Sequence, residues 1–139
     1  MKSPSNGRPV EILLVEDNPG DVRFTEEVLK DASVRNHLSI AKDGVEALAF
    51  LRREGQFSKS PRPDLILLDL NLPKKNGLEM LTEIKNVEGL KEIPVVILTT
   101  SEAEPDINKS FDLYANCYIT KPIDLERLSM VLGSIKTEY

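Results

Sequence analysis

The apolar run at residues 65–68 (LILL), which ends on Asp69, is the feature that most constrains the fold of this chain. Four uninterrupted apolar residues are too few for a typical helix and suit a strand that is buried on both faces of a parallel sheet. Asp69 then stands at the carboxyl end of that strand, where open α/β sheets bind their ligands. An aspartate at this position can also simply cap the following turn, so its function depends on the residues that join it.

Four other short apolar segments share this character, at residues 10–15, 38–41, 95–98 and 117–119. Between and after them, apolar residues recur at helical spacing in five stretches, near residues 19–32, 44–53, 78–86, 101–114 and 124–135. Strands that alternate with helices indicate a parallel sheet covered on both faces, because parallel neighbours need helical crossovers. We therefore predict a doubly wound α/β fold with five strands in the order 2-1-3-4-5 and five flanking helices.

The length of 139 residues fits one domain with a continuous core. We expect residues 1–9, which are rich in Ser, Pro and Gly, to form a flexible tail. The domain would then span residues 10–136, with residues 137–139 as a short C-terminal tail. Residues 54–63 are expected to form an irregular surface loop, because their Ser, Pro and Lys content disfavours regular structure.

Composition excludes several classes of protein. The net charge of -5 argues against nonspecific binding to nucleic acid. The longest apolar runs have about five residues, too few for a membrane span or a secretory signal, so we expect a cytoplasmic protein. Cys117 is the single cysteine, which excludes an intramolecular disulfide, and we expect it to pack in the core. His37 is also single and is expected only to begin a strand.

Charged or polar residues stand at the predicted carboxyl ends of several strands. Glu16 and Asp17 end the first strand, and Thr99 and Lys121 end the fourth and fifth. In the order 2-1-3-4-5 the first and third strands are neighbours, so the acidic pair converges on Asp69. Three adjacent carboxylates repel one another unless a cation that prefers oxygen lies among them, and Mg²⁺ is the natural candidate. With a hydroxyl and an ammonium added, such a site can hold a phosphoryl group on Asp69.

Over about residues 10–135 the chain resembles the receiver domains of two-component response regulators, which have a flavodoxin-like fold. The motifs that match are the acidic pair Glu16-Asp17, the phosphoacceptor Asp69 in DLNLPKKNG, the switch hydroxyl Thr99, the switch aromatic Tyr118, and Lys121-Pro122. The resemblance implies that Asp17 and Asp69 bind Mg²⁺ directly, with Mn²⁺ as a substitute. It further implies that Glu16 acts on the metal through water and that the main-chain carbonyl of Asn71 completes the ligands.

The resemblance also implies a function. A histidine kinase or a phosphotransfer protein would phosphorylate Asp69, after which Thr99 and Tyr118 move. The surface formed by the fourth helix, the fifth strand and the fifth helix would then signal to a partner protein or form a homodimer. The protein would not be an enzyme for external substrates but a phosphoacceptor switch, with self-catalysed phosphotransfer and slow self-dephosphorylation.

Three features resemble stand-alone receivers that partner bacteriophytochrome-type histidine kinases. They are the spacing of the loop at residues 54–63 and the amino-acid sequences at residues 60–77 and 94–101. We expect no output domain after Tyr139, and therefore expect the signal to pass through a partner, a dimer or a phosphorelay.

The chain also departs from the usual receiver pattern. Glu16 replaces the commoner Asp, and Thr100 is bulkier than the usual Ala or Gly. Asn71 and Ser101 occupy positions that tune hydrolysis of the acyl phosphate in the family. The bond between Lys121 and Pro122 is expected to be cis.

Other functions and simpler interpretations compete with this one. An aspartate-nucleophile phosphohydrolase of the haloacid-dehalogenase type needs a second Asp two residues after the nucleophile, where this chain has Asn71. A flavodoxin-like cofactor carrier needs a phosphate loop after the first strand, where Glu16 and Asp17 would repel phosphate. Taken singly, Lys121 could also be a solvated surface lysine and Tyr118 an ordinary core aromatic.

Overall fold

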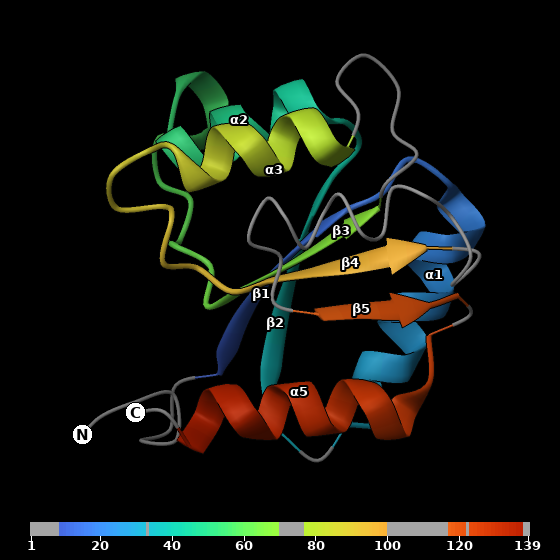
Figure 1. The fold of residues 1–139 in the computed structure, drawn as a ribbon. Helices are drawn as coiled ribbons and strands as arrows, with labels where there is room; N and C mark the ends of the chain where they lie inside the picture. Colours follow the sequence, from blue (N-terminus) through green and yellow to red (C-terminus); the bar gives the residue numbers. More distant parts are fainter. Residues whose placement is uncertain (1–8, 33, 70–76, 100–116, 122, 138–139) are drawn as a thin grey trace.

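A parallel five-stranded sheet forms the centre of the computed structural model, which describes residues 9–32, 34–69, 77–99, 117–121 and 123–137 (Figure 1). The strand order is β2-β1-β3-β4-β5, so the predicted order 2-1-3-4-5 is confirmed. The strands are β1 (Val10–Val15), β2 (Asn36–Ala41), β3 (Leu65–Asp69), β4 (Val95–Thr99) and β5 (Cys117–Thr120).

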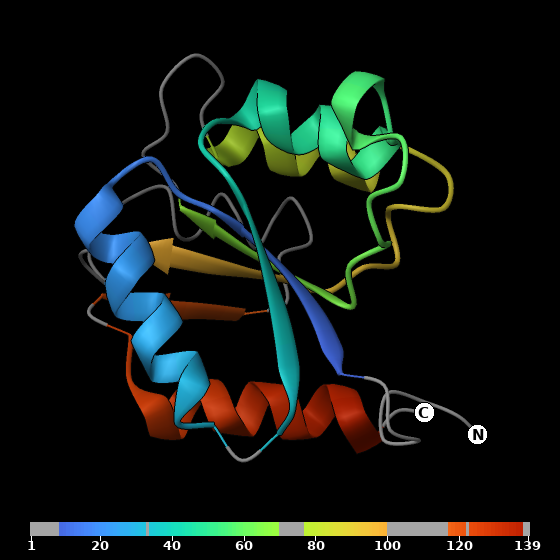
Figure 2. The ribbon, with the colours of Figure 1, turned by 180° about the vertical axis from the view of Figure 1, so that it is seen from behind.

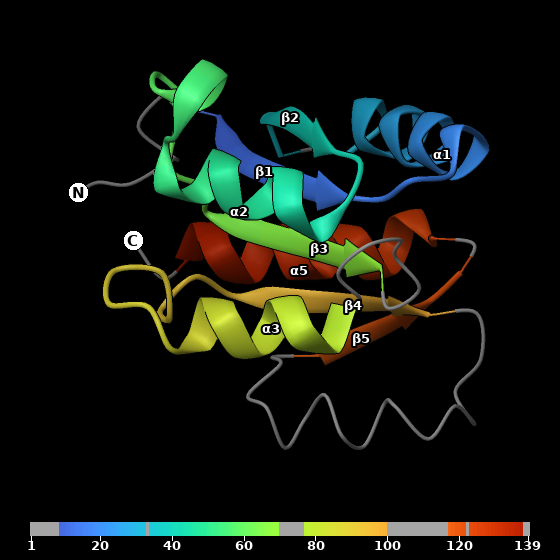
Figure 3. The same ribbon diagram turned by 90° about the horizontal axis from the view of Figure 1, so that it is seen from above.

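Helices cover both faces of the sheet. One face carries α1 (Pro19–Lys30) and α5 (Leu125–Thr137), and the other carries α2 (Gly44–Arg52) and α3 (Gly77–Lys85), as Figures 1, 2 and 3 show from three sides. The fourth predicted helix, at residues 101–114, lies outside the described residues. Within the described part of the chain, no helix is both long enough and apolar enough to cross a membrane.

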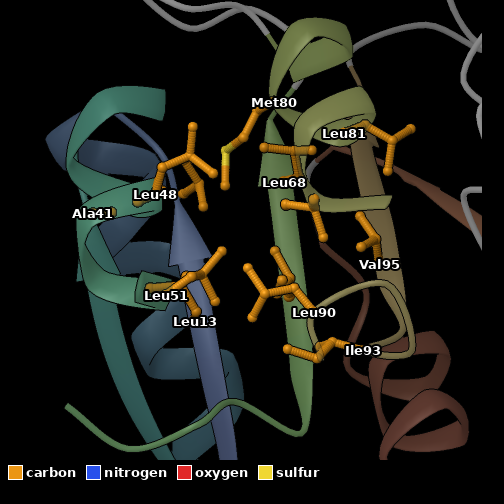
Figure 4. Close-up of a cluster of buried hydrophobic side chains, with 14 of the residues drawn as sticks. Leu13, Ala41, Leu48, Leu51, Leu68, Met80, Leu81, Leu90, Ile93 and Val95 are labelled. Carbon is orange, nitrogen blue, oxygen red and sulfur yellow. The ribbon is translucent and has the colours of Figure 1, made fainter. Parts of the chain in front are cut away.

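The strand side chains alternate between two apolar clusters, as a period of two requires. One cluster lies between the sheet and the pair α2 and α3 and takes Leu13 and Leu68 (Figure 4). The other lies on the side of α1 and α5 and takes Leu14 and Leu67. Every residue of β3 and β4 is buried, which confirms the predicted burial of these strands on both faces.

Helix α1 begins as its sequence predicts. The side chain of Asn18 caps the helix by accepting a hydrogen bond from the backbone N–H of Asp21 at 3.0 Å, and Pro19 occupies the first turn. After α1 the chain enters β2, where His37 is the second residue and its Nδ1 lies 2.8 Å from Glu11 Oε1 on β1. One polar contact therefore lies at the start of α1, and another lies at the start of the strand that follows it.

Two apolar residues within the predicted helical stretches, Val45 and Leu125, are exposed. Val45 is 54% exposed, because the buried stripe of α2 is centred on Ala47, Leu48 and Leu51, roughly 120° around the helix from it. Leu125 is 37% exposed, because helical side chains point toward the N-terminus and Leu125 is the first residue of α5.

The loop at residues 54–63 was predicted to lack regular structure, and this is wrong for Gly55–Phe57, which forms a short 3-10 helix. Its Phe57 ring packs on Phe50 of α2 with ring centroids 5.6 Å apart. An aromatic anchor thus orders a stretch whose Ser and Pro content alone argues for irregularity. Arg62 Nη2 further ties the loop to the carbonyl of Gly89, at 3.0 Å.

Other boundaries also move. The second strand begins at Asn36, two residues before its apolar segment, because main-chain pairing with β1 extends beyond the apolar residues. Helix α3 ends at Lys85, one residue before the end of its predicted stretch, and the Lys85 ammonium donates to the carbonyls of Lys91 and Ile93. Cys117 begins β5, but its side chain lies outside what the structure describes.

Replacing Leu67 by Ala should destabilise the fold by about 2–5 kcal/mol, because Leu67 is fully buried and its truncation leaves a cavity between β3 and α5. Val45→Ala is the matched control, since the exposed position should change stability by no more than about 0.5 kcal/mol. Urea unfolding of both variants measures the difference. Equal effects would contradict the assignment of Leu67 to the core.

Candidate functional site

Three carboxylates meet at the carboxyl ends of β1 and β3. Glu16 follows β1 directly and Asp69 ends β3, and the two strands are paired with Val15 opposite Leu68. One carboxylate oxygen from each of Glu16, Asp17 and Asp69 lies within 4.8 Å of the other two. The convergence predicted from the strand order is therefore present.

The alternation of strand side chains explains why these groups share one side of the sheet. Leu65 and Leu67 point toward α1 and α5, so Asp69, two residues further, continues on that side. Glu16 follows Val15, which faces the opposite cluster, and so it also turns toward α1 and α5. The carboxylates converge because the sheet register and the alternation agree.

The three carboxylates differ in their access to water. Glu16 and Asp69 are buried, with 2% and 5% of their surface exposed, whereas Asp17 is exposed. The donor atoms are all oxygen, two of them fixed inside the fold and one open to solvent. This donor set suits a hard divalent cation that keeps part of its water shell.

Lys121 supplies the positive charge of the site. Its Nζ lies 2.8 Å from Glu16 Oε1, 2.9 Å from Asp21 Oδ2 and 3.1 Å from Asp69 Oδ2. An ammonium has three N–H donors, so each carboxylate accepts one of them. The backbone N–H of Lys121 donates to the carbonyl of Thr99 at 2.6 Å, which anchors the residue beside the end of β4. Lys121 is therefore not a solvated surface lysine.

The buried charges shift each other's ionisation. Burial raises the pKa of Glu16 to about 7, and the neighbouring Asp69 carboxylate adds to this shift. Burial also opposes the charged form of Lys121, but hydrogen bonds to Glu16 and Asp21 and the charge of Asp69 outweigh it, so its pKa lies above the ordinary value. The ammonium stays charged at neutral pH, while Glu16 is partly protonated there in the absence of a cation.

The two predicted switch residues lie on β4, which pairs with β3, and on β5, which pairs with β4. Thr99 is the last residue of β4 and is fully buried, one position beyond Leu98, which pairs with Asp69. Tyr118 lies on β5 and is partly buried against the cluster under α2 and α3. Its backbone carbonyl accepts a hydrogen bond from Arg127 Nη2 of α5 at 3.3 Å. Thr99 thus lies on the strand beside Asp69, whereas the Tyr118 side chain packs on the face of the sheet opposite α5.

Several predicted site residues lie outside the described residues, namely Asn71, Thr100, Ser101 and Pro122. The predicted carbonyl ligand, the predicted tuning positions and the predicted cis bond therefore stay predictions.

Asp21 is the one partner of Lys121 that the sequence analysis missed. No local signal pointed to Asp21, because an acidic residue in the first turn of a capped helix is already explained by the helix dipole. Its partner is 100 residues away in the chain, so the pairing depends on how α1 packs against the end of β5.

Comparison with known proteins agrees with this geometry. Residues 12–132 match the model of the response regulator receiver domain. The chain is 49% identical over 135 residues to response regulator Rcp1 of a Synechocystis species, which covers 97% of this chain and 92% of that protein.

Two solved structures are also similar to the chain. The Mn²⁺-bound form of Rcp1 has a TM-score of 0.77 and 50% identity, covering 93% of both chains. The phosphorylated cyanobacterial phytochrome response regulator RcpA has a TM-score of 0.78 and 50% identity, covering 91% of both chains. The predicted flavodoxin-like fold and the resemblance to phytochrome-associated receivers are both confirmed. The chain belongs to the response regulator receiver domain family of two-component signalling.

Proposed function

We propose that Asp69 accepts a phosphoryl group from a histidine kinase in a reaction that depends on Mg²⁺. The single observation that carries this proposal is the contact between the buried Asp69 carboxylate and the Lys121 ammonium, 3.1 Å apart, beside two further carboxylates. A buried carboxylate with a fixed cation and a cluster of oxygen ligands is the arrangement that phosphoryl transfer to a carboxylate needs.

In the reaction, a carboxylate oxygen of Asp69 attacks the phosphorus of a phosphohistidine. The new oxygen–phosphorus bond forms as the phosphorus–nitrogen bond breaks, and the electron pair of that bond returns to the imidazole nitrogen, which takes up a proton. Lys121 stays beside Asp69 and balances the negative charge of the phosphoryl oxygens.

Asp17 and Asp69 would hold Mg²⁺ directly and Glu16 through water, with Asn71 as a further main-chain ligand. When bound, the metal supplies positive charge to the phosphoryl oxygens. The Mn²⁺-bound structure of the similar Rcp1 supports a divalent cation, and Mn²⁺ would also serve in place of Mg²⁺ here.

Phosphorylation would change the surface on the side of β5. Thr99 would approach the phosphoryl group and Tyr118 would turn inward, which remodels the face of the fourth helix, β5 and α5. That face would then bind a downstream protein or a second copy of the chain. The similarity to RcpA and Rcp1 supports a phytochrome-type histidine kinase, directly or through a phosphotransfer protein, as the source of the phosphoryl group.

The chain would act as a switch and not as an enzyme for external substrates. It would catalyse its own phosphotransfer and lose the phosphoryl group slowly by hydrolysis, at a rate tuned by Asn71, Thr100 and Ser101. Steady turnover of a simple phosphomonoester would instead favour the aspartate-nucleophile phosphohydrolase.

Incubation with acetyl phosphate and Mg²⁺ should add one phosphoryl group to the protein, detected by intact mass. Asp69→Asn should reduce the incorporation to background, because an amide oxygen is a poor nucleophile. Asp31→Asn, which changes an exposed aspartate at the end of α1, is the matched control and should be labelled like the wild type. Labelling that persists in Asp69→Asn would reject Asp69 as the acceptor.

Mg²⁺ should bind about tenfold more weakly at pH 5.5 than at pH 7.5, measured by calorimetric titration. In the folded, metal-free protein the pKa of Glu16 is about 7, raised from 4.5. Protonated Glu16 therefore makes its full contribution to the stability of the fold below pH 4.5, and this contribution is lost as the pH rises through 7. A cation that prefers ionised Glu16 must displace that proton at low pH, so its affinity grows as pH rises.

Glu16→Gln is the control for this pH dependence, because glutamine does not titrate. The variant should bind Mg²⁺ less tightly at pH 7.5 and lose most of the change between the two pH values. An unaltered pH dependence in Glu16→Gln would assign the effect to another group.

A further inference from the structure

Asp21 contacts the same ammonium as the phosphoacceptor but lies outside the acidic cluster. Its Oδ2 is 2.9 Å from Lys121 Nζ, between the 2.8 Å contact to Glu16 and the 3.1 Å contact to Asp69. The cluster whose oxygens lie within 4.8 Å of one another holds Glu16, Asp17 and Asp69. Asp21 therefore binds the Lys121 ammonium but is not one of the three carboxylates that would hold a metal ion.

The backbone of Asp21 is fixed on both sides. Its N–H donates to the cap oxygen of Asn18 at 3.0 Å, and its carbonyl accepts a hydrogen bond from Thr25 Oγ1 at 2.9 Å. Thr25 is buried, with 2% of its surface exposed. The carboxylate of Asp21 thus projects from a first turn of α1 whose own hydrogen bonds do not involve Asp69.

The surroundings of the Asp21–Lys121 ion pair indicate which partner the ammonium would have if the Asp21 charge were removed. A pocket of about 260 Å³ opens beside the pair and is lined by Gly20, Asp21, Phe24, Thr25, Lys121 and Ile123. The Asp21 side chain is 44% exposed, whereas that of Lys121 is 14% exposed. If the Asp21 charge were lost, water in this pocket would be the available partner for the ammonium, and water restrains an ammonium less than a fixed carboxylate does.

The three carboxylates that contact Lys121 would change in different ways during the proposed reaction. An oxygen of Asp69 forms the new bond to phosphorus, and Glu16 would interact through water with a bound metal ion. Asp21 undergoes neither change and can keep its hydrogen bond throughout. The N–H that Asp69 releases is then free to meet a phosphoryl oxygen while the ammonium itself stays in place.

We propose that Asp21 is a positioning residue, which holds the Lys121 ammonium beside Asp69 and thereby speeds phosphoryl transfer. The proposal rests on the phosphoacceptor function proposed above. Because the pair is partly exposed, the expected effect is modest, about two- to fivefold in rate.

Two measurements test the proposal. The first is the rate of hydrogen exchange of the Lys121 ammonium, followed by NMR in the metal-free, unphosphorylated protein. The second is the initial rate of phosphorylation by acetyl phosphate with Mg²⁺, which needs no kinase. Both use the full chain and compare Asp21→Asn, which keeps the shape and removes the charge, with Asp21→Glu, which keeps the charge.

The matched control is Glu27→Gln, which removes a charge from another ion pair of α1, between Glu27 and Lys30 at 3.6 Å. Asp21→Asn should exchange its Lys121 ammonium protons faster and be phosphorylated about two- to fivefold more slowly than the wild type. Asp21→Glu should recover most of the rate, and Glu27→Gln should match the wild type in both measurements.

An unchanged exchange rate of the Lys121 ammonium in Asp21→Asn would overturn the claim that Asp21 holds this ammonium in place. Faster exchange with an unchanged or higher phosphorylation rate would overturn the claim that the position speeds transfer. Failure of the proposed function is distinguishable from both, because then the wild type itself would incorporate no phosphoryl group on Asp69. The exchange measurement would still decide whether Asp21 holds Lys121.

Discussion

The ammonium of Lys121 is the charge on which the carboxyl end of this sheet depends. Glu16 and Asp69 are both buried, and two carboxylates so close together and so far from water repel each other strongly. A third carboxylate, from Asp21, meets the same ammonium. Removing one partner of a buried ion pair leaves an uncompensated charge, which typically costs about 3–5 kcal/mol. The same cation therefore keeps the strand ends together and prepares the site for an anion.

This network also joins parts of the fold that are distant in the chain. Lys121 follows β5, and its three partners come from the end of β1, the first turn of α1 and the end of β3. Its backbone N–H adds β4 through the carbonyl of Thr99. Lys121 thus connects Asp69 both to the strand that carries Tyr118 and to the helix that carries Asp21. The site is a junction of secondary structure elements, and this suits a switch.

Much of the fold follows from local patterns, and the exceptions have physical causes. The uninterrupted run before Asp69 predicted a doubly buried strand, and the structure has one. Periodicity does not predict the exposure of Val45 and Leu125, because it records which residues are apolar but not where the buried face of a helix is centred or how the side chains of its first turn are directed. It also missed the 3-10 turn at Gly55–Phe57, because that turn is ordered by a ring contact with Phe50 from another element.

The sequence by itself determined the fold and the residues at its edge: short apolar strands that end on carboxylates, a hydroxyl and a lysine lead to a doubly wound fold with an acidic edge and one lysine. These features are local, so each is visible in a few consecutive residues. Only the tertiary structure decided that Asp21 shares the Lys121 ammonium and that burial raises the pKa of Glu16 to about 7. Both depend on how α1 packs against the ends of β1 and β5, and a contact across 100 residues of chain leaves no local pattern in the sequence.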